Sequence, residues 1–382
     1  MSATSADVHA LLSAGGGGKS GSLLPHQRRD VLGVLRDFVD ANEDARTSPN
    51  YRSETRDEMR AVFDLLASPE CARDEEVCVY ALKFLKIASR KEPNRRAFGR
   101  HGVAAVLRPL RDPTSARVAA EASNVILNAC YEKENVEHVL ECGGAEPLVR
   151  LVSHDAEPVR ANALGAVQSV CFRKTGRAKV RELGGVAAIL EALERSVENG
   201  NLDARTGTGT HPSAGARTLT LTRAAGAAHN VSGDAESIRL FRAAGRRGVP
   251  LLVSLLRSDV PEVAGSAAGA IQNLSRERAC RRLIRVEGAI PALGDLLVAG
   301  DPVARASAAG ALLNILGPEL GDDDGHKGDA REVEGSGTMA TKTKTKTAEG
   351  RRALGKLISS ALALSAAWEA LYESTPDPGA GA

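Results

Sequence analysis

The side chains with the most regular spacing in this 382-residue sequence are small and polar, and they lie 41, 61, 43 and 41 residues apart: Asn128, Ser169, Asn230, Asn273 and Asn314. An asparagine amide offers one acceptor and two donors, so a row of them can pair with the N–H and C=O groups of an extended peptide. The same amides can instead bond a neighbouring helix and fix its packing. Both interpretations stay open. Gln168, His229 and Gln272 each precede one of these positions and join the candidate peptide-binding set.

Other reactive residues lack the spacing or setting that catalysis needs. The eight histidines show no HExxH or HxxxH spacing, which argues against a zinc site. A Gly-Lys-Ser at 18–20 follows a glycine tract rather than a strand, and Asp322, Asp323 and Asp324 are consecutive in a polar segment. We therefore expect a non-enzymatic protein without catalytic residues, metal, cofactor or small-molecule substrate.

Composition narrows the class of protein further. Apolar residues make up 43% of the chain and aromatic residues 3%, so a core must be built from Ala, Leu, Val and Ile. No apolar run reaches the roughly 18 residues of a membrane span, and the first residues lack the pattern of a secretory signal. The six cysteines contain no CxxC pair and predict reduced thiols. We expect a protein of the cytoplasm and/or nucleus.

The elements that must carry the polar residues form an internal repeat. Glycine-led segments open at residues spaced 42, 41, 63 and 40 apart: Gly102, Gly144, Gly185, Gly248 and Gly288. The long spacing of the glycines and the long spacing of the polar residues fall in the same unit. Each segment continues with an apolar run at helical spacing, a polar break containing Asp or Pro, and an Ala/Gly-rich helix. Stacked helical repeats have this period, and each buries its apolar face only against its neighbours.

The phrases GAIPALGDLL at 288–297, AAGAIQNLS at 267–275 and AAGALLNIL at 308–316 resemble the armadillo repeat family. The resemblance covers about residues 60–316, with a degenerate first unit at 59–89 in which Lys86 takes the asparagine position. It implies that the repeated asparagines hold a peptide backbone. Nuclear-import members of the family usually carry Trp four residues earlier; here those positions hold Asn124, Gly165, Gly226, Gly269 and Gly310, so that role is not expected.

The predicted fold class is all-α, a right-handed α-solenoid of about six armadillo-type repeats with helical caps. Residues 1–24 and 375–382 are expected to be disordered tails, and 25–58 a capping helix with a linker. The repeats occupy 59–316, with an insertion loop at 197–217, and a low-complexity linker covers 317–348. The helical segment 349–374 either caps the stack or folds back onto the groove or a partner.

A run of arginines in the last two units forms a possible patch for an acidic partner: Arg239, Arg242, Arg246, Arg247, Arg278, Arg281, Arg282 and Arg285. Because aromatic residues are not interleaved with these cations, nucleic acid is a poorer match than protein. We expect a scaffold or adaptor that binds an extended or acidic segment of another protein in a concave groove. The alternatives are a structural subunit of a larger assembly, for example a cytoskeletal one, and a regulator that binds a small GTPase.

Overall fold

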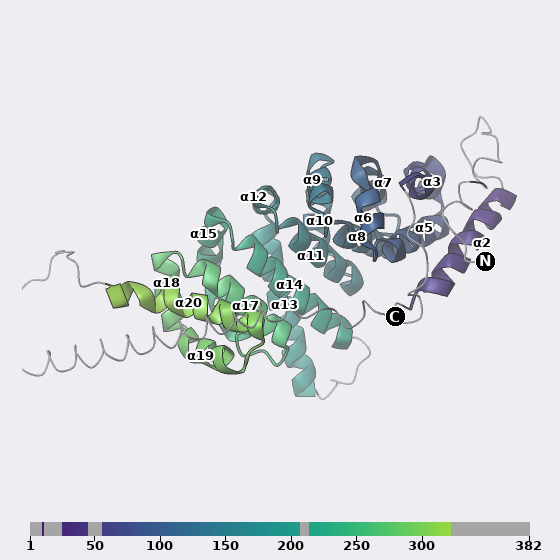
Figure 1. The fold of residues 1–382 in the computed structure, drawn as a ribbon. Coiled ribbons are helices and arrows are strands. Elements are labelled where there is room, and N and C mark those ends of the chain that lie inside the picture. Colours follow the sequence, from purple (N-terminus) through teal and green to yellow (C-terminus); the bar gives the residue numbers. More distant parts are fainter. Residues whose placement is uncertain (1–9, 11–24, 45–55, 207–213, 322–382) are drawn as a thin grey trace, which may run out of the picture. The chain divides into compact units, whose positions relative to one another are not determined.

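The structure, a computed structural model, describes residue 10 and residues 25–44, 56–206 and 214–321 (Figure 1). The regular secondary structure in these ranges is entirely helical, as predicted. The chain divides into two compact units, Met1–Asp234 and Ala235–Ala382, and each is described by itself. In these ranges no helix is both long and apolar enough to cross a membrane.

The first unit is a succession of helical repeats. Helix α2 (Pro25–Asn42) precedes a first repeat formed by α3 (Arg56–Ala67), the short α4 (Pro69–Arg73) and α5 (Glu75–Ala88). Three three-helix repeats follow: α6 (Glu92–Ala97), α7 (Gly99–Arg111) and α8 (Ala116–Ala129); α9 (Lys133–Glu141), α10 (Ala145–Leu151) and α11 (Glu157–Val170); and α12 (Lys174–Glu182), α13 (Gly185–Thr206) and α14 (Ala214–Val231).

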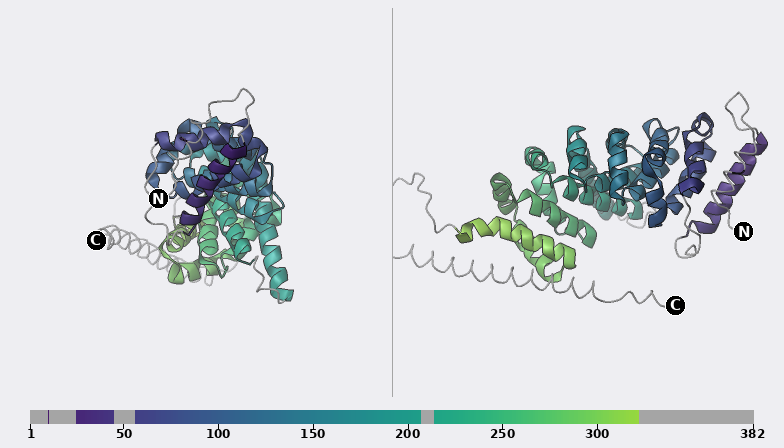
Figure 2. Two further views of the ribbon diagram at one scale, coloured as in Figure 1. Left: turned by 90° about the vertical axis from the view of Figure 1, so that its right-hand side faces the viewer. Right: turned by 45° about the horizontal axis from the view of Figure 1, so that its top comes forward.

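The last helices of successive repeats form one continuous layer. Helix α5 packs on α8, α8 on α11 and α11 on α14, while α7, α10 and α13 each pack against the last helix of their own repeat (Figure 2). Small side chains such as Ala122, Ala163 and Ala228 are fully buried and allow these helices to approach closely. The layer therefore places one position of every repeat in a row.

Helix α2 covers the first repeat. Its apolar face, Val31, Leu32, Leu35 and Phe38, is at most 4% exposed, and the Phe38 ring lies 4.1 Å from that of Phe84 on α5. This is the arrangement expected of a capping helix, because the end of a solenoid otherwise exposes the apolar surface that a neighbouring repeat would cover.

The second unit contains two more repeats. The first consists of α15 (Ala235–Ala243), the 3-10 turn η1 (Gly245–Arg247), α16 (Val249–Leu255) and α17 (Pro261–Leu274). The second consists of α18 (Arg278–Val286), α19 (Ala289–Ala299) and α20 (Pro302–Gly321), and α20 packs on α17. Proline in the first turn starts α17 and α20, and Asp301 caps α20 by accepting from the backbone N–H of Ala304 at 3.0 Å.

Arginines hold successive helices together at the carboxyl ends of the last helices. Arg95, Arg177 and Arg281 lie near the starts of α6, α12 and α18, and each donates to two backbone carbonyls that close the preceding helix, at 3.0–3.3 Å. A cation at this place satisfies carbonyls that lack helical partners and complements the helix dipole.

The expected loop at 197–217 is wrong for most of its length. Helix α13 runs on to Thr206 and α14 begins at Ala214, so only 207–213 lie outside the described residues. The expected linker at 317–348 also begins as helix, since α20 ends at Gly321; the predicted segments 349–374 and 375–382 lie outside the described residues.

Candidate peptide-binding face

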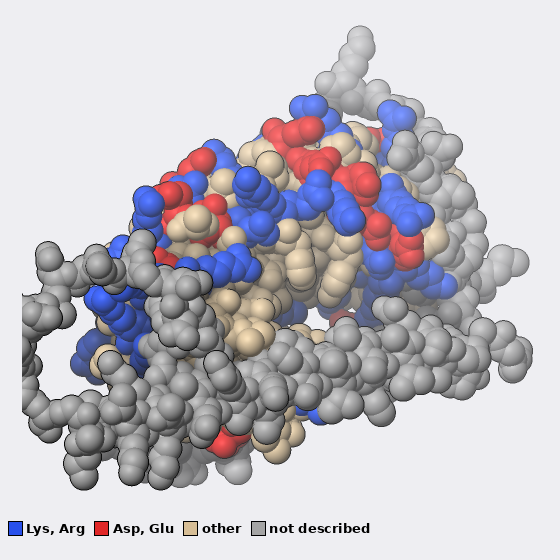
Figure 3. Space-filling model, turned by 60° about the vertical axis from the view of Figure 1, so that its left-hand side comes forward, with Lys and Arg blue, Asp and Glu red and all other residues tan. Residues whose placement is uncertain are grey.

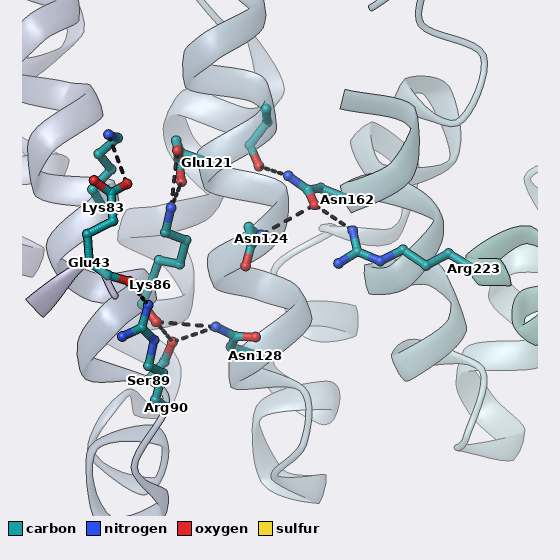
Figure 4. A network of polar contacts seen from close by, with 11 residues as sticks. Glu43, Lys83, Lys86, Ser89, Arg90, Glu121, Asn124, Asn128, Asn162 and Arg223 are labelled. Atoms are coloured by element: carbon teal, nitrogen blue, oxygen red, sulfur yellow. Dashed lines mark hydrogen bonds and ion pairs between the residues drawn. The ribbon is translucent and has the colours of Figure 1, made fainter. Parts of the chain in front are cut away.

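The repeated asparagines join neighbouring repeats through their amide nitrogens. Asn128 Nδ2 lies 3.3 Å from Lys86 O and 3.1 Å from Ser89 Oγ, at the end of α5 (Figure 4). In the second unit, Asn314 Nδ2 makes the same pair of bonds to Gln272 O at 3.2 Å and Ser275 Oγ at 3.0 Å. These bonds are the packing role that the sequence left open.

The amide oxygens remain accessible at three of the five positions. Asn230 Nδ2 donates to Gln168 O at 2.9 Å, and among the described residues the Oδ1 atoms of Asn128, Asn230 and Asn314 have no hydrogen-bond partner. These three side chains are partly exposed, whereas Ser169 and Asn273 are only 6% and 9% exposed. One amide can therefore fix a neighbouring helix with its nitrogen and accept a peptide N–H with its oxygen.

The same hydrogen bonds correct the register of the first repeat. Lys86 O receives the amide of Asn128 just as Gln272 O receives that of Asn314, so Lys86 is equivalent to Gln272. Ile87, which is fully buried, therefore takes the asparagine position, and the assignment of Lys86 to that position is wrong. Spacing alone missed this because the distance between repeats varies by one residue.

Glycines four residues before the asparagine positions are covered by side chains from adjacent repeats. A Cβ at Gly226 would lie 2.4 Å from Gln168 Nε2, and a Cβ at Gly310 would lie 2.1 Å from Gln272 Nε2. Two of the predicted groove residues, Gln168 and Gln272, thus lie across the positions where import members of the family carry Trp. The surface there consists of amide groups rather than aromatic slots.

A line of polar side chains crosses the layer of last helices in the first unit, and Figure 4 shows it from α5 to α14. We call it the polar row: Lys83, Lys86, Glu121, Asn124, Asn162 and Arg223. Lys86 Nζ pairs with Glu121 Oε2 at 3.0 Å, and Lys83 Nζ lies 3.4 Å from Glu43 Oε1, at the end of α2.

The polar row ends in an amide and guanidinium cluster. Asn162 Oδ1 accepts from Asn124 Nδ2 at 3.3 Å and from Arg223 Nη1 at 2.5 Å, while Asn162 Nδ2 donates to Ala120 O at 2.9 Å. Burial lowers the pKa of the Arg223 guanidinium, because desolvation disfavours the charged form. Burial likewise lowers the pKa of His229, so this predicted groove residue is neutral at pH 7.

A hollow of about 350 Å³ opens beside the row. Lys83 and Glu121 line it together with Ala116, Arg117 and Pro158, so it lies between the beginnings of α8 and α11 and the middle of α5. Exposed aromatic residues occupy the other ends of two of these helices, since Tyr131 is 69% and Phe172 is 67% exposed. The layer therefore offers a polar strip with a hollow and apolar side chains at its edge.

The polar row contains residues that the sequence analysis did not select. Glu121, Asn162 and Arg223 each lie seven residues before an asparagine position, at Asn128, Ser169 and Asn230. Because this repeat position changes from acid to amide to cation, a search for one recurring residue type passes over it. Comparing the repeats position by position for polar character would have found it.

Some arginines of the predicted patch in the second unit are engaged by contacts within the chain. Arg239 and Arg242 pair with Glu236 and Glu277, each at 3.1 Å, and Arg281 is the helix cap described above. Arg285 donates to Ile315 O, and the other members are exposed: Arg246, Arg247, Arg278 and Arg282. Basic and acidic side chains are interspersed over much of the face shown in Figure 3, which is typical of a solvated surface.

Comparison with known proteins defines the class of these repeats. The family model named "Armadillo/beta-catenin-like repeat" matches residues 132–172 and 247–276. The splicing regulator ARVCF of Homo sapiens is 32% identical over 124 residues, 32% of this chain and 12% of that protein, and ARVCF of Mus musculus matches equally. The chain thus spans about an eighth of the length of these relatives.

Solved structures show the same architecture. A designed armadillo repeat protein matches with a TM-score of 0.56 and 23% identity over 67% of this chain and 99% of its own. Another, in complex with the peptide (KR)4, matches with a TM-score of 0.54 and 23% identity over 68% of this chain and 99% of its own. The fold is therefore an α-solenoid of the armadillo type. The resemblance seen in the sequence is confirmed for the fold and for the repeats at 132–172 and 247–276, which match the armadillo model.

Proposed function

We propose that the protein is a non-enzymatic scaffold or adaptor that binds an extended segment of another protein along the polar row and its hollow. The observation that carries this proposal is the pair of amide oxygens at Asn128 and Asn230 of the first unit, which have no partner among the described residues. Regularly spaced acceptors on stacked helices match the repeating N–H groups of an extended chain.

The likeness to known proteins supports the same role. A designed armadillo repeat protein of this fold binds the peptide (KR)4. Here the corresponding surface carries Gln168 over Gly226 and a cation at Arg223, which favours a different and less basic segment. We expect the protein to act in the cytoplasm and/or nucleus, with no catalytic residue, metal or cofactor.

Selection from a library of short random peptides on the immobilised full chain tests the proposal. Ala116 is exposed and lines the hollow, so Ala116→Trp fills the site without touching the core. We expect Ala116→Trp to weaken selected peptides at least about tenfold in fluorescence anisotropy. Ala104→Trp, at an exposed alanine of α7 in the same repeat, is the matched control and leaves affinity within about twofold.

Two outcomes contradict the proposal. The first is a selection that enriches no peptide sensitive to Ala116→Trp. The second is a native complex that is stoichiometric and resists high salt, which favours a permanent structural subunit, or one that forms only with a nucleotide-bound GTPase.

A further inference from the structure

Arg223 is the cation of the polar row that has no carboxylate partner among the described residues. Lys83 and Lys86 are both neutralised, by Glu43 at 3.4 Å and by Glu121 at 3.0 Å. Within the described residues the Arg223 guanidinium hydrogen bonds to the neutral amide oxygen of Asn162. A half-buried positive charge without a counter-ion is costly, and an anionic ligand would offset that cost.

The surroundings of Arg223 leave space for its side chain and hold it in place. At Gly165, on the neighbouring α11, a Cβ would lie 3.2 Å from both Cδ and Nε of Arg223, so the glycine lets the side chain lie close to that helix. Leu127 Cδ1 lies 3.1 Å from the same Cβ position. Leu127 and Arg223 thus both pack at this glycine, and burial there lowers the pKa of the Arg223 guanidinium.

Asn162 orients the guanidinium and is itself fixed. Its Nδ2 donates to Ala120 O at 2.9 Å, and its Oδ1 accepts from both Asn124 at 3.3 Å and Arg223 at 2.5 Å. Arginine has five N–H donors, and this contact uses one of them. The remaining donors include a planar pair that matches the two oxygens of a carboxylate.

We propose that Arg223 binds an Asp or Glu side chain of the partner's extended segment, with Asn162 as the residue that positions the guanidinium. This inference rests on the proposed function, because it assigns the partner's charge at the same site. One guanidinium beside neutral amides suits a single carboxylate better than a phosphate dianion, which calls for several cations.

A double-mutant cycle on peptides from the library tests the assignment. Each selected peptide is synthesised with its acidic residue and with the corresponding amide, and both are titrated against wild-type protein, Arg223→Gln and Arg223→Lys. In wild type the acid-to-amide change weakens binding at least about tenfold, the value of a charged hydrogen-bonded pair. In Arg223→Gln the same change weakens binding less than about twofold. Arg223→Lys is intermediate, because lysine keeps the charge but lacks the planar pair of N–H donors.

Arg100→Gln is the matched control for charge. Arg100 lies on α7, pairs at 3.5 Å with the exposed Glu141, and its side chain is 69% exposed. Its loss therefore leaves the tenfold acid-to-amide effect unchanged. Unaltered far-UV circular dichroism of Arg223→Gln shows that the variant is folded.

The outcomes separate this inference from the proposed function. Peptides could bind in a manner sensitive to Ala116→Trp while the acid-to-amide effect is the same in wild type and Arg223→Gln. In that case the pairing of Arg223 with an acidic residue is wrong and the peptide-binding function stands. If no peptide depends on Ala116, the function itself fails. If replacing Asp322, Asp323 and Asp324 by Asn raises peptide affinity several-fold, the chain's own acidic segment is the occupant, and assignment to a partner is overturned.

Discussion

Replacing Asn128 with alanine tests the bond that joins the first two repeats. The change removes donations to Lys86 O at 3.3 Å and to Ser89 Oγ at 3.1 Å. Lys86 O still accepts from Ser89 Oγ at 2.8 Å, so the carbonyl is not left without a partner. The expected loss is therefore the net value of one to two ordinary hydrogen bonds, about 1 kcal/mol, rather than the larger cost of a buried unsatisfied group.

Asn128→Asp distinguishes the hydrogen bond from mere loss of volume. Aspartate keeps the shape of the side chain but exchanges the donor nitrogen for an oxygen, which then faces the carbonyl end of α5. The negative end of the helix dipole lies there, so charge repulsion adds to the lost donation. We expect Asn128→Asp to cost about 2 kcal/mol, more than alanine, although aspartate differs less in size.

Urea unfolding followed by far-UV circular dichroism measures both changes, with hydrogen exchange of the last amides of α5 as a local readout. Glu134→Ala, at an exposed residue of α9, is the control and leaves the midpoint unchanged. The reasoning is refuted if Asn128→Ala unfolds at the same urea concentration as this control, or if Asn128→Asp is no less stable than Asn128→Ala.

Three further predictions follow from backbone geometry and burial. Gly176→Ala places a Cβ 2.0 Å from Val170 O, so we expect a loss of about 3 kcal/mol or more in the free energy of unfolding, or failure to fold, measured by urea denaturation. Gly143→Ala, at φ +70° with open space around it, costs only about 1 kcal/mol in the same assay. Burial raises the pKa of the Cys130 thiol to about 12, so its thiolate is scarce in the native protein at pH 8. We expect iodoacetamide to label the partly exposed Cys142 first, as followed by mass spectrometry. Equal labelling of the two thiols contradicts this prediction.

The repeat and its helices were predictable because they depend on local composition. The period fixes which residues are equivalent, and glycine, Asp and Pro mark where helices begin and end. Gly143, Gly184 and Gly288 adopt positive φ values of 70°, 77° and 74°, which is the conformation expected of glycine at these helix ends. Stacking then follows, since no repeat can bury its apolar face alone.

The contacts between repeats were not predictable from the period. Whether Asn128 meets Lys86 or Ile87 depends on how far one helix is shifted along its neighbour, and that shift is set by side-chain packing over the whole layer. The helical extension of α13 was missed because the glycine, threonine and serine content of 197–217 favours a loop on average, whereas the helix continues to Thr206.

The asparagine position and the position seven residues before it can contribute differently to binding. At the asparagine position, Asn128 and Asn230 use their amide nitrogens within the protein, so what they offer a partner is a backbone acceptor that does not read sequence. The position seven residues earlier changes from Glu121 to Asn162 to Arg223, and each residue faces a different neighbour. Affinity for an extended chain then comes from the regular position and selectivity from the variable one. Substitutions in the first should weaken all selected peptides alike, whereas Arg223→Gln should weaken only those that carry the acidic residue.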